Sequence, residues 1–206
     1  MGLAQAPRGT AIIVNPGSGP GERPDFFYEG AIAAINDRAQ IPVGYIDSNY
    51  GKRTAANVAA DAECFSDWYG IDRFFLDQVD GAADRLDHYR SVAGAISGIG
   101  RFTAMNFGQP VIDPGYAELC ELTANFEGDL VEYAAAKFPA LEDNVGSRSW
   151  HFVYGVRTTN ELERVLGLAR SRGVARIFVT DAGMPNPWST CPPYWNLEIA
   201  AVGDQR

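Results

Sequence analysis

Two carboxylates, Asp77 and Glu127, are the residues best placed to do chemistry. Each directly follows a short apolar run, 74–76 for the aspartate and 123–126 for the glutamate. Two carboxylates that face one cleft are what glycoside hydrolysis requires, because one acts as the acid and the other as base, nucleophile or charge stabiliser. The alternative is structural: Asp77 would cap the following turn and Glu127 would pair with an arginine. Position along the chain does not decide between these readings.

Further polar residues follow apolar runs in the same way and are candidates for binding a substrate. They are Asn15, Asp47, Asn106, Tyr154 and Asp181, together with Gln78 beside Asp77. Asp47 and Asp181 could equally cap their loops. Sugar rings pack their C–H faces on aromatic planes, so aromatic residues near these strand ends could hold a carbohydrate, although a core role is open for each of them: Tyr45, Tyr154, Trp188 and Trp195.

The chain lacks the residues that several other types of enzyme reaction need. The chain has two lysines, Lys52 and Lys137, and neither lies in a predicted strand, which argues against a Schiff-base enzyme. The two histidines, His88 and His151, do not have metal-ligand spacing, and we interpret His151 as structural. No G-x-S-x-G nucleophile motif occurs. We expect no cofactor and no metal, although a magnesium site built from Asp47, Asp77 and Glu127 is an alternative.

Seven apolar runs with helical patterns between them must position these residues. The runs are 11–14, 43–46, 74–76, 103–105, 123–126, 151–153 and 177–180, and the helical patterns cover 25–39, 54–69, 83–97, 129–138, 160–172 and 194–202. Strands without polar alternation are typical of a parallel sheet covered on both faces. Because nearly every run ends on a polar residue, a (β/α) TIM-type barrel is favoured over an open sheet. Seven strands make that barrel incomplete.

Composition limits the class of protein further. The 206 residues fit one domain, 1–206. A formal net charge of −9 argues against nucleic acid as a partner. No apolar stretch reaches the roughly 20 residues of a membrane span, and residues 1–9 are too short and polar for a signal peptide. The loop 15–21 (NPGSGPG) lacks the Gly-Lys-Ser/Thr ending of a P-loop, so we interpret it as a rigid turn.

Six segments together resemble the spherulin-4-like proteins, glycoside hydrolase family 135. They are IIVNPGSGPG (12–21), GYIDSNYGKR (44–53), YGIDRFFLDQV (69–79), NFEG (125–128), HFVYG (151–155) and FVTDAGMPNPWSTCPPYW (178–195). The resemblance implies a (β/α)8 barrel that acts outside the cell and cleaves exopolysaccharide containing galactosamine or N-acetylgalactosamine. It also implies that the acidic site maps onto Asp77 and Glu127.

The chain departs from this family in two places. Family members usually carry one more strand before 11–15, so we expect an open edge there, through which the protein could self-associate. The residue after Asp77 is often glutamate in the family, whereas here it is Gln78, which forms hydrogen bonds but transfers no proton. Three readings therefore remain: a glycoside hydrolase, a non-catalytic carbohydrate-binding or cell-surface protein, and a metal-assisted barrel enzyme.

Overall fold

The computed structural model describes residues 6–110, 113–138 and 148–203, and these divide into two compact units. The N-terminal unit comprises residues 8–107 and 113–123. The C-terminal unit comprises the other described residues, 6–7, 108–110, 124–138 and 148–203. Each unit has its own hydrophobic core. The prediction of a single domain over 1–206 stays a prediction.

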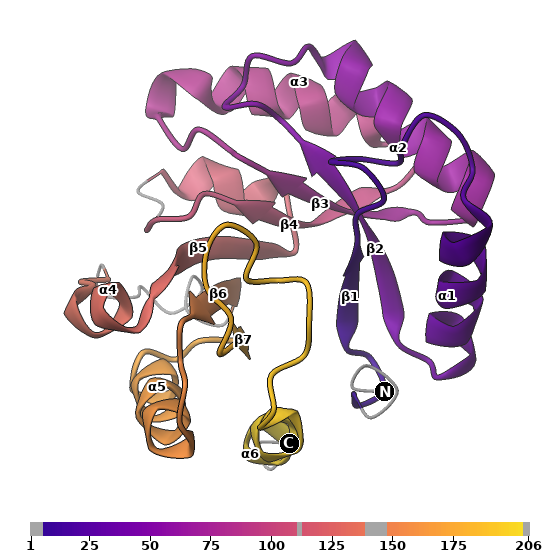
Figure 1. Cartoon of the computed structure of the whole chain (residues 1–206). Helices are drawn as coiled ribbons and strands as arrows, with labels where there is room; N and C mark the ends of the chain where they lie inside the picture. Colours follow the sequence, from indigo (N-terminus) through magenta and orange to yellow (C-terminus); the bar gives the residue numbers. More distant parts are fainter. Residues whose placement is uncertain (1–5, 111–112, 139–147, 204–206) are drawn as a thin grey trace. The chain divides into compact units, whose positions relative to one another are not determined.

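The N-terminal unit alternates strands and helices along the chain (Figure 1). Its elements are β1 (Ala11–Val14), α1 (Phe26–Asp37), β2 (Ile41–Asp47), α2 (Ala55–Tyr69), β3 (Arg73–Asp77), the 3₁₀ helix η2 (Ala83–Arg85), α3 (Leu86–Ile96), β4 (Arg101–Asn106) and the 3₁₀ helix η3 (Pro114–Glu118). Strands β1 to β4 pair in chain order and all of these pairs are parallel. Polar side chains begin the first two helices: Asp25 accepts from the Phe27 N–H and Thr54 from the Asn57 N–H.

The two faces of strands β1–β4 differ in what they contact. Residues of one face, including Ile46, Phe74, Leu76 and Met105, belong to the hydrophobic core together with buried residues of α1, α2 and α3. Gly44 lies on this face of β2, where a Cβ atom would stand 2.8 Å from the Phe65 ring of α2. Because side chains alternate along a strand, the other face carries Tyr45, Phe75 and Asp77. The helices therefore cover one face and leave the candidate residues on the other.

A β-bulge in β4 sets which residue lies opposite Asp77. Phe74 pairs with Phe102, but Phe75 pairs with Ala104, so Thr103 is an extra residue in the ladder. After the bulge Leu76 pairs with Met105, and the next residue of β4, Asn106, takes the position opposite Asp77. Bulges of this kind re-aim side chains near functional sites. If the same strand paired without a bulge, Met105 would occupy that position.

The C-terminal unit continues the same alternation. Strand β5 (Leu122–Asp129), whose first two residues belong to the N-terminal unit, leads into α4 (Leu130–Ala135), followed by β6 (Ser149–Tyr154), α5 (Thr159–Ser171), β7 (Arg176–Val179) and α6 (Trp195–Gly203). Strands β6 and β7 are parallel, with Phe152 opposite Phe178. Capping boxes start two helices: Asp129 with Glu132 begins α4, and Thr158 with Glu161 begins α5.

His151 is a core residue of the C-terminal unit, in keeping with the structural role predicted for it. Its Nδ1 lies 2.9 Å from the Tyr133 hydroxyl, and its ring stacks on Phe138 with centroids 4.8 Å apart. The Arg172 guanidinium lies over the rings of Tyr133 and Phe138. Burial, with a smaller contribution from the Arg172 charge, lowers the pKa of His151 to about 3. The imidazole is therefore neutral at physiological pH.

Glu198 of α6 accepts a hydrogen bond from the backbone at the outer edge of β7. The Thr180 N–H donates to Val153 of β6, so the preceding residue, Val179, directs its N–H away from β6. That N–H donates to Glu198 Oε1 over 2.8 Å. Glu198 is 2 % exposed, and burial raises its pKa to about 8. A side chain thus takes the place that a neighbouring strand's carbonyl would hold at this edge.

The strand order confirms the predicted fold class. Seven strands follow one another as β1-β2-β3-β4-β5-β6-β7 within the described residues, with helices between them, so the fold is an incomplete α/β barrel. Strand β1 stands at one end of this order, where the open edge was expected. Self-association through it stays a prediction. None of the helices in the described part of the chain is long and apolar enough to cross a membrane.

The boundaries of four predicted elements were wrong. The helix expected over 129–138 ends at Ala135, and the one expected over 83–97 begins with the 3₁₀ turn η2. Helix α5, expected over 160–172, begins at Thr159 and is capped by Thr158, because the capping box satisfies its first N–H groups. Glu127 lies inside β5 rather than after its end, because the strand continues to Asp129.

Candidate functional site

Two side chains hold the Asp77 carboxylate, one on each oxygen. The Tyr45 hydroxyl of β2 donates to Oδ2 over 2.6 Å, and the Asn106 side-chain amide of β4 donates to Oδ1 over 2.8 Å. Asp77 ends the strand between them. All three residues were predicted site residues, and the structure brings them together at the carboxyl ends of three adjacent strands.

This arrangement fixes the orientation of the carboxylate. A single donor would allow the group to turn about its Cβ–Cγ bond, whereas donors on both oxygens hold its plane. Both donors are themselves anchored, because Tyr45 stacks on Phe75 with ring centroids 6.3 Å apart and Asn106 is only 6 % exposed. A pre-oriented carboxylate suits the stabilisation of positive charge that develops at a defined point. Asp77 is half-buried and still reachable from solvent.

Gln78, directly after Asp77, has a left-handed backbone with φ of +53°. This conformation costs a non-glycine residue on the order of 1–2 kcal/mol, so the surrounding contacts must hold it. The Gln78 carbonyl accepts from the Ser48 hydroxyl over 2.6 Å and from the Tyr50 N–H over 2.9 Å. The next N–H, of Val79, donates to the Asn106 carbonyl over 2.9 Å. These three hydrogen bonds hold the backbone in the sharp turn that follows Asp77.

A buried tyrosine supports this turn from behind. Tyr89 of α3 is fully buried, and its hydroxyl lies 3.2 Å from the Ser48 hydroxyl and accepts from the Asp80 N–H over 2.9 Å. Burial raises the pKa of Tyr89, so the phenol stays protonated. Sequence reasoning did not identify Ser48 or Tyr89 as relevant to the site. Tyr89 lies in the helical pattern expected over 83–97, but the contacts of its hydroxyl group depend on the folded loop.

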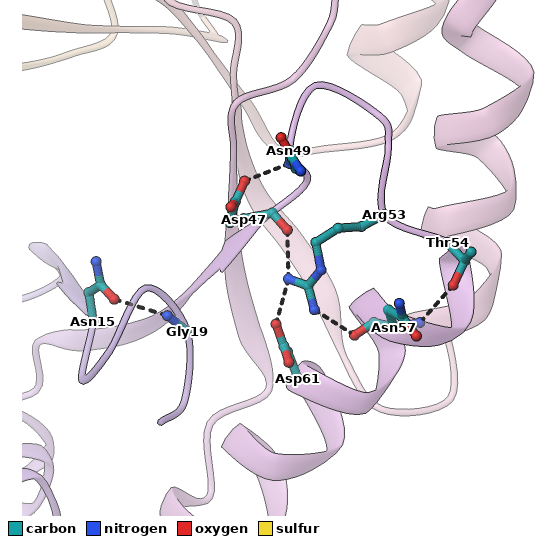
Figure 2. A network of polar contacts seen from close by, with 8 residues as sticks. All are labelled: Asn15, Gly19, Asp47, Asn49, Arg53, Thr54, Asn57 and Asp61. Atoms are coloured by element: carbon teal, nitrogen blue, oxygen red, sulfur yellow. Dashed lines mark hydrogen bonds and ion pairs between the residues drawn. The ribbon is translucent and has the colours of Figure 1, made fainter. Parts of the chain in front are cut away.

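Asp47 and Asn15 shape the loops beside Asp77. Asp47 is the register partner of Asp77, its Oδ1 accepts from the Asn49 N–H over 2.5 Å, and its carbonyl accepts from Arg53 over 2.7 Å. Asn15 Oδ1 accepts from the Gly19 N–H over 3.1 Å, which closes the expected rigid turn (Figure 2). These contacts fit the loop-capping reading. Substrate binding by Asn15, Asp47 or Gln78 stays a prediction.

In the C-terminal unit, Tyr154 and Trp188 lie together. Their ring centroids are 6.0 Å apart and nearly perpendicular, and Trp188 also contacts Phe152 and Phe178. Burial raises the pKa of Tyr154, with smaller contributions from the carboxylates of Glu132, Asp129 and Glu127. Glu127 is exposed, and its N–H donates to the Gly108 carbonyl over 3.2 Å. Tyr154 and Glu127 are therefore close enough to interact electrostatically.

The predicted residues fall into two groups, one in each unit. Asn15, Tyr45, Asp47, Asp77, Gln78 and Asn106 belong to the N-terminal unit, and Glu127, Tyr154, Asp181 and Trp188 belong to the C-terminal unit. Asp181 follows β7 and is half-buried. The expectation that Asp77 and Glu127 face one cleft stays a prediction. Within the described ranges, no three His, Cys, Asp or Glu side chains gather in a way that could hold a metal ion.

Known proteins match this chain at the level of family and of fold. The family model for spherulation-specific family 4 (Spherulin4) matches residues 4–202. Spherulin-4 of Physarum polycephalum is 32 % identical over 82 residues, which cover 39 % of this chain and 25 % of that protein. The chain thus matches about a quarter of that relative's length.

Two solved structures share the fold. The crystal structure of Aspergillus clavatus Sph3 in complex with GalNAc aligns with a TM-score of 0.76 at 20 % identity, covering 93 % of this chain and 85 % of that one. A chitinase from Rhizomucor miehei aligns with a TM-score of 0.57 at 10 % identity, covering 96 % of this chain and 93 % of that one. The first of these structures contains the sugar GalNAc, and the second is of a protein named as a chitinase.

Proposed function

Because the chain belongs to spherulation-specific family 4, we propose that it is a glycoside hydrolase that cleaves an exopolysaccharide containing galactosamine or N-acetylgalactosamine. The observation that carries this proposal is the Asp77 carboxylate, which two side chains hold in a fixed orientation at the carboxyl end of a barrel strand. The fold shared with Sph3 in complex with GalNAc supports the sugar class. A protein of this function would act outside the cell.

Each carboxylate has its own part in the proposed mechanism. Glu127 protonates the oxygen of the leaving sugar, and Asp77 acts as nucleophile or stabilises the oxocarbenium-like transition state. Asp77 suits the second part because Tyr45 and Asn106 present it as a hydrogen-bond acceptor with both oxygens occupied. Glu127 is exposed, so its carboxyl group can be reached by a substrate. If the two roles were reversed, Asp77 would have to be protonated as the general acid, although both of its carboxylate oxygens already accept hydrogen bonds.

The remaining candidate residues would bind the substrate. Tyr154 and Trp188 form an aromatic corner on which a sugar ring can pack. Asp181 follows the neighbouring strand β7 in the same unit. Asn15, Asp47 and Gln78 would contribute hydrogen bonds to hydroxyl or acetamido groups from the N-terminal unit.

Charge-removing substitutions at the two carboxylates test this proposal. Asp77→Asn and Glu127→Gln should each reduce cleavage of a galactosamine-containing polymer by about 10²–10⁴-fold, the usual contribution of such a group. The fold should persist in Asp77→Asn, because the new carbonyl oxygen can accept from Asn106 while the new amide faces Tyr45. Release of reducing ends measures the rate. Asp87→Asn and Glu163→Gln are matched controls on exposed positions of α3 and α5 and should leave the rate unchanged. Full activity in Glu127→Gln would exclude the assignment.

The non-catalytic reading is favoured by one specific observation, the glutamine at position 78. If that position needed a glutamate, the wild type would bind the polymer without cleaving it, and Gln78→Glu would create activity. The substitution is well matched, because glutamine and glutamate differ little in shape and either residue must adopt the same left-handed backbone at position 78. If Asp77 and Glu127 suffice, the wild type cleaves the polymer and Gln78→Glu changes its rate little.

A further inference from the structure

The exposed and half-buried acidic side chains of the C-terminal unit are gathered at one end of its strands, and the other end is basic. The acidic residues lie where strands end or where the following helices begin: Glu127, Asp129, Glu132, Glu161, Glu163 and Asp181. The basic end, as we call it, lies where helices end and strands begin and consists of Lys137, Arg170, Arg172 and Arg176. The segments that carry these four residues, 136–138 and 168–177, contain no acidic residue.

Hydrogen bonds within the unit hold the segments of the basic end together. The Arg172 guanidinium donates to the Ala136 carbonyl over 3.2 Å, which places the residues after α4 beside the end of α5. The Gly173 N–H donates to the Arg170 carbonyl over 3.0 Å in the short connection between α5 and β7 (Figure 1). Arg176 is the first residue of β7 and lies opposite Trp150 of β6. The four positive charges therefore come from neighbouring segments of one unit.

No carboxylate neutralises the basic end within the part of the chain that the structure describes. The ion pairs found there all involve arginines of the N-terminal unit. Arg170, Arg172 and Arg176 donate instead to backbone carbonyls, which carry no formal charge. Lys137 is exposed, and Nη1 of Arg172 is buried without a hydrogen-bond partner among the described residues. The four charges therefore keep their attraction for an anion from outside.

The dipole of α5 accounts for only part of this arrangement. Cations near the end of a helix interact favourably with its last carbonyls, and Arg170 and Arg172 stand at the end of α5. Arg176 begins a strand and Lys137 lies beyond the end of α4, so neither belongs to the last turn of a helix. The protein as a whole has a formal net charge of −9. Four cations without an acidic residue in their segments therefore indicate a surface that meets an anionic partner.

The chemistry of the basic end selects among anionic partners. Three of its four cations are arginines, whose planar guanidinium groups bind carboxylates through two parallel hydrogen bonds. None of the large exposed hydrophobic side chains lies in segments 136–138 or 168–177, whereas a membrane anchor or a protein interface needs such residues. The acidic remainder of the protein would repel a nucleic-acid duplex. A polar, extended chain with spaced carboxylates fits all of these conditions.

From this arrangement we propose that the basic end binds an acidic polysaccharide, a chain that carries uronate carboxylates, which is not the substrate. The carboxylates pair with Lys137, Arg170 and Arg176, and the half-buried Arg172 adds its positive charge. Glu127 and Asp181 lie at the other end of the strands of this unit, so the bound chain leaves them accessible. Such binding would hold the protein on an acidic matrix, and it does not require that the protein cleaves any polymer.

Titration with a galacturonate hexasaccharide tests this proposal directly. The fully methyl-esterified hexasaccharide is the matched probe, because it has the same sugar rings without the charges. Both are titrated into the wild-type protein by calorimetry at neutral pH, at low and at physiological salt. The acidic probe should bind at least about tenfold more tightly than its ester, because several exposed ion pairs act together, and its affinity should fall as salt is added. Equal affinities, or no binding of the acidic probe, would overturn the proposal.

Two double variants with the same change in net charge locate the binding surface. Arg170→Gln/Arg176→Gln removes two exposed cations of the basic end and should weaken binding of the acidic probe about fivefold to tenfold. Arg157→Gln/Arg164→Gln removes two exposed cations from the loop before α5 and from its first half, and should weaken binding less than about twofold, because salt screens charges at that distance. An equal loss in the two variants would show that only net charge matters and would overturn the proposed surface.

Two further probes address the other anionic partners, and a cleavage assay separates this proposal from the proposed function. Vesicles that contain phosphatidylglycerol and a short DNA duplex, measured at physiological salt, should each bind at least about fivefold more weakly than the acidic hexasaccharide. Tighter binding of either one would overturn the assignment to a polysaccharide. Arg170→Gln/Arg176→Gln should cleave a galactosamine-containing polymer as the wild type does. If the wild type cleaves nothing but binds the acidic probe through the basic end, only the hydrolase proposal fails.

Discussion

Replacing Glu198 by glutamine should make the protein more stable at neutral pH and change the pH dependence of its stability. Glu198 is 2 % exposed, its Oε1 accepts from the Val179 N–H, and its Oε2 has no hydrogen-bond partner among the described residues. Burial raises its pKa to about 8 from an ordinary value of 4.5. The folded protein therefore keeps a proton on this group over a pH range in which the unfolded chain releases it.

The sign and size of the effect follow from this difference. Because the unfolded state binds fewer protons between pH 4.5 and 8, the free energy of unfolding falls as the pH rises, by up to about 1.4 kcal/mol per unit. Below pH 4.5 both states are protonated and Glu198 imposes no penalty. By pH 7 the accumulated penalty is on the order of 3 kcal/mol. Glutamine keeps the acceptor for Val179 and carries no charge, so it should escape this penalty.

Urea unfolding at a series of pH values measures the effect. Tryptophan fluorescence is a suitable probe, because Trp150, Trp188 and Trp195 all lie in the C-terminal unit with Glu198. The advantage of Glu198→Gln over the wild type should grow steadily from pH 5 to pH 8. Glu163→Gln, on the exposed side of α5, is the matched control and should show a constant difference. An advantage of Glu198→Gln that does not change with pH would refute the reasoning.

Three further predictions concern the site and the core. Tyr45→Phe removes one donor from the Asp77 carboxylate and should lower the cleavage rate about tenfold to a hundredfold with an unchanged circular dichroism spectrum, whereas an unchanged rate would show that the donor has no catalytic effect. Gln78→Gly relieves the left-handed strain and should raise the free energy of unfolding by about 1 kcal/mol, and a loss of stability would contradict the strain argument. His151→Gln should flatten the loss of stability between pH 6.5 and 3, because wild-type His151 stays neutral while the unfolded chain takes up a proton, and identical acid profiles would be inconsistent with this view.

Much of the fold followed from simple patterns. The seven apolar runs without polar alternation correctly predicted the seven strands found among the described residues, and the helices between them lie close to their predicted ranges. The polar residue after each run placed Asp77 and Asn106 at strand ends. Those patterns are local, which is why a single sequence reveals them.

Other features were not predictable because they depend on the pairing of distant residues. The bulge at Thr103 decides that Asn106 and not Met105 lies opposite Asp77, and nothing in the sequence of β4 indicates an extra residue there. Strand β5 extends beyond Glu127, where the Glu127 N–H donates a hydrogen bond to the carbonyl of Gly108, a residue distant in sequence. Glu198 looked like an ordinary polar position of a C-terminal helix, and only the neighbouring edge of β7 gives it a buried partner.

The bulge in β4 gives this strand one residue more than its ladder with β3 needs, so the strand tolerates a change of length in one direction only. Deletion of Thr103 would close the bulge, leave Ala104 opposite Phe75 and keep the Asn106 amide on the carboxylate of Asp77. Insertion of one residue at the same place would demand a wider bulge. If the ladder kept its one-residue bulge instead, every later residue would move by one place and turn to the other face, so that Met105 lay opposite Asp77. Shortening of the strand therefore preserves the chemistry beside Asp77, whereas lengthening exchanges it.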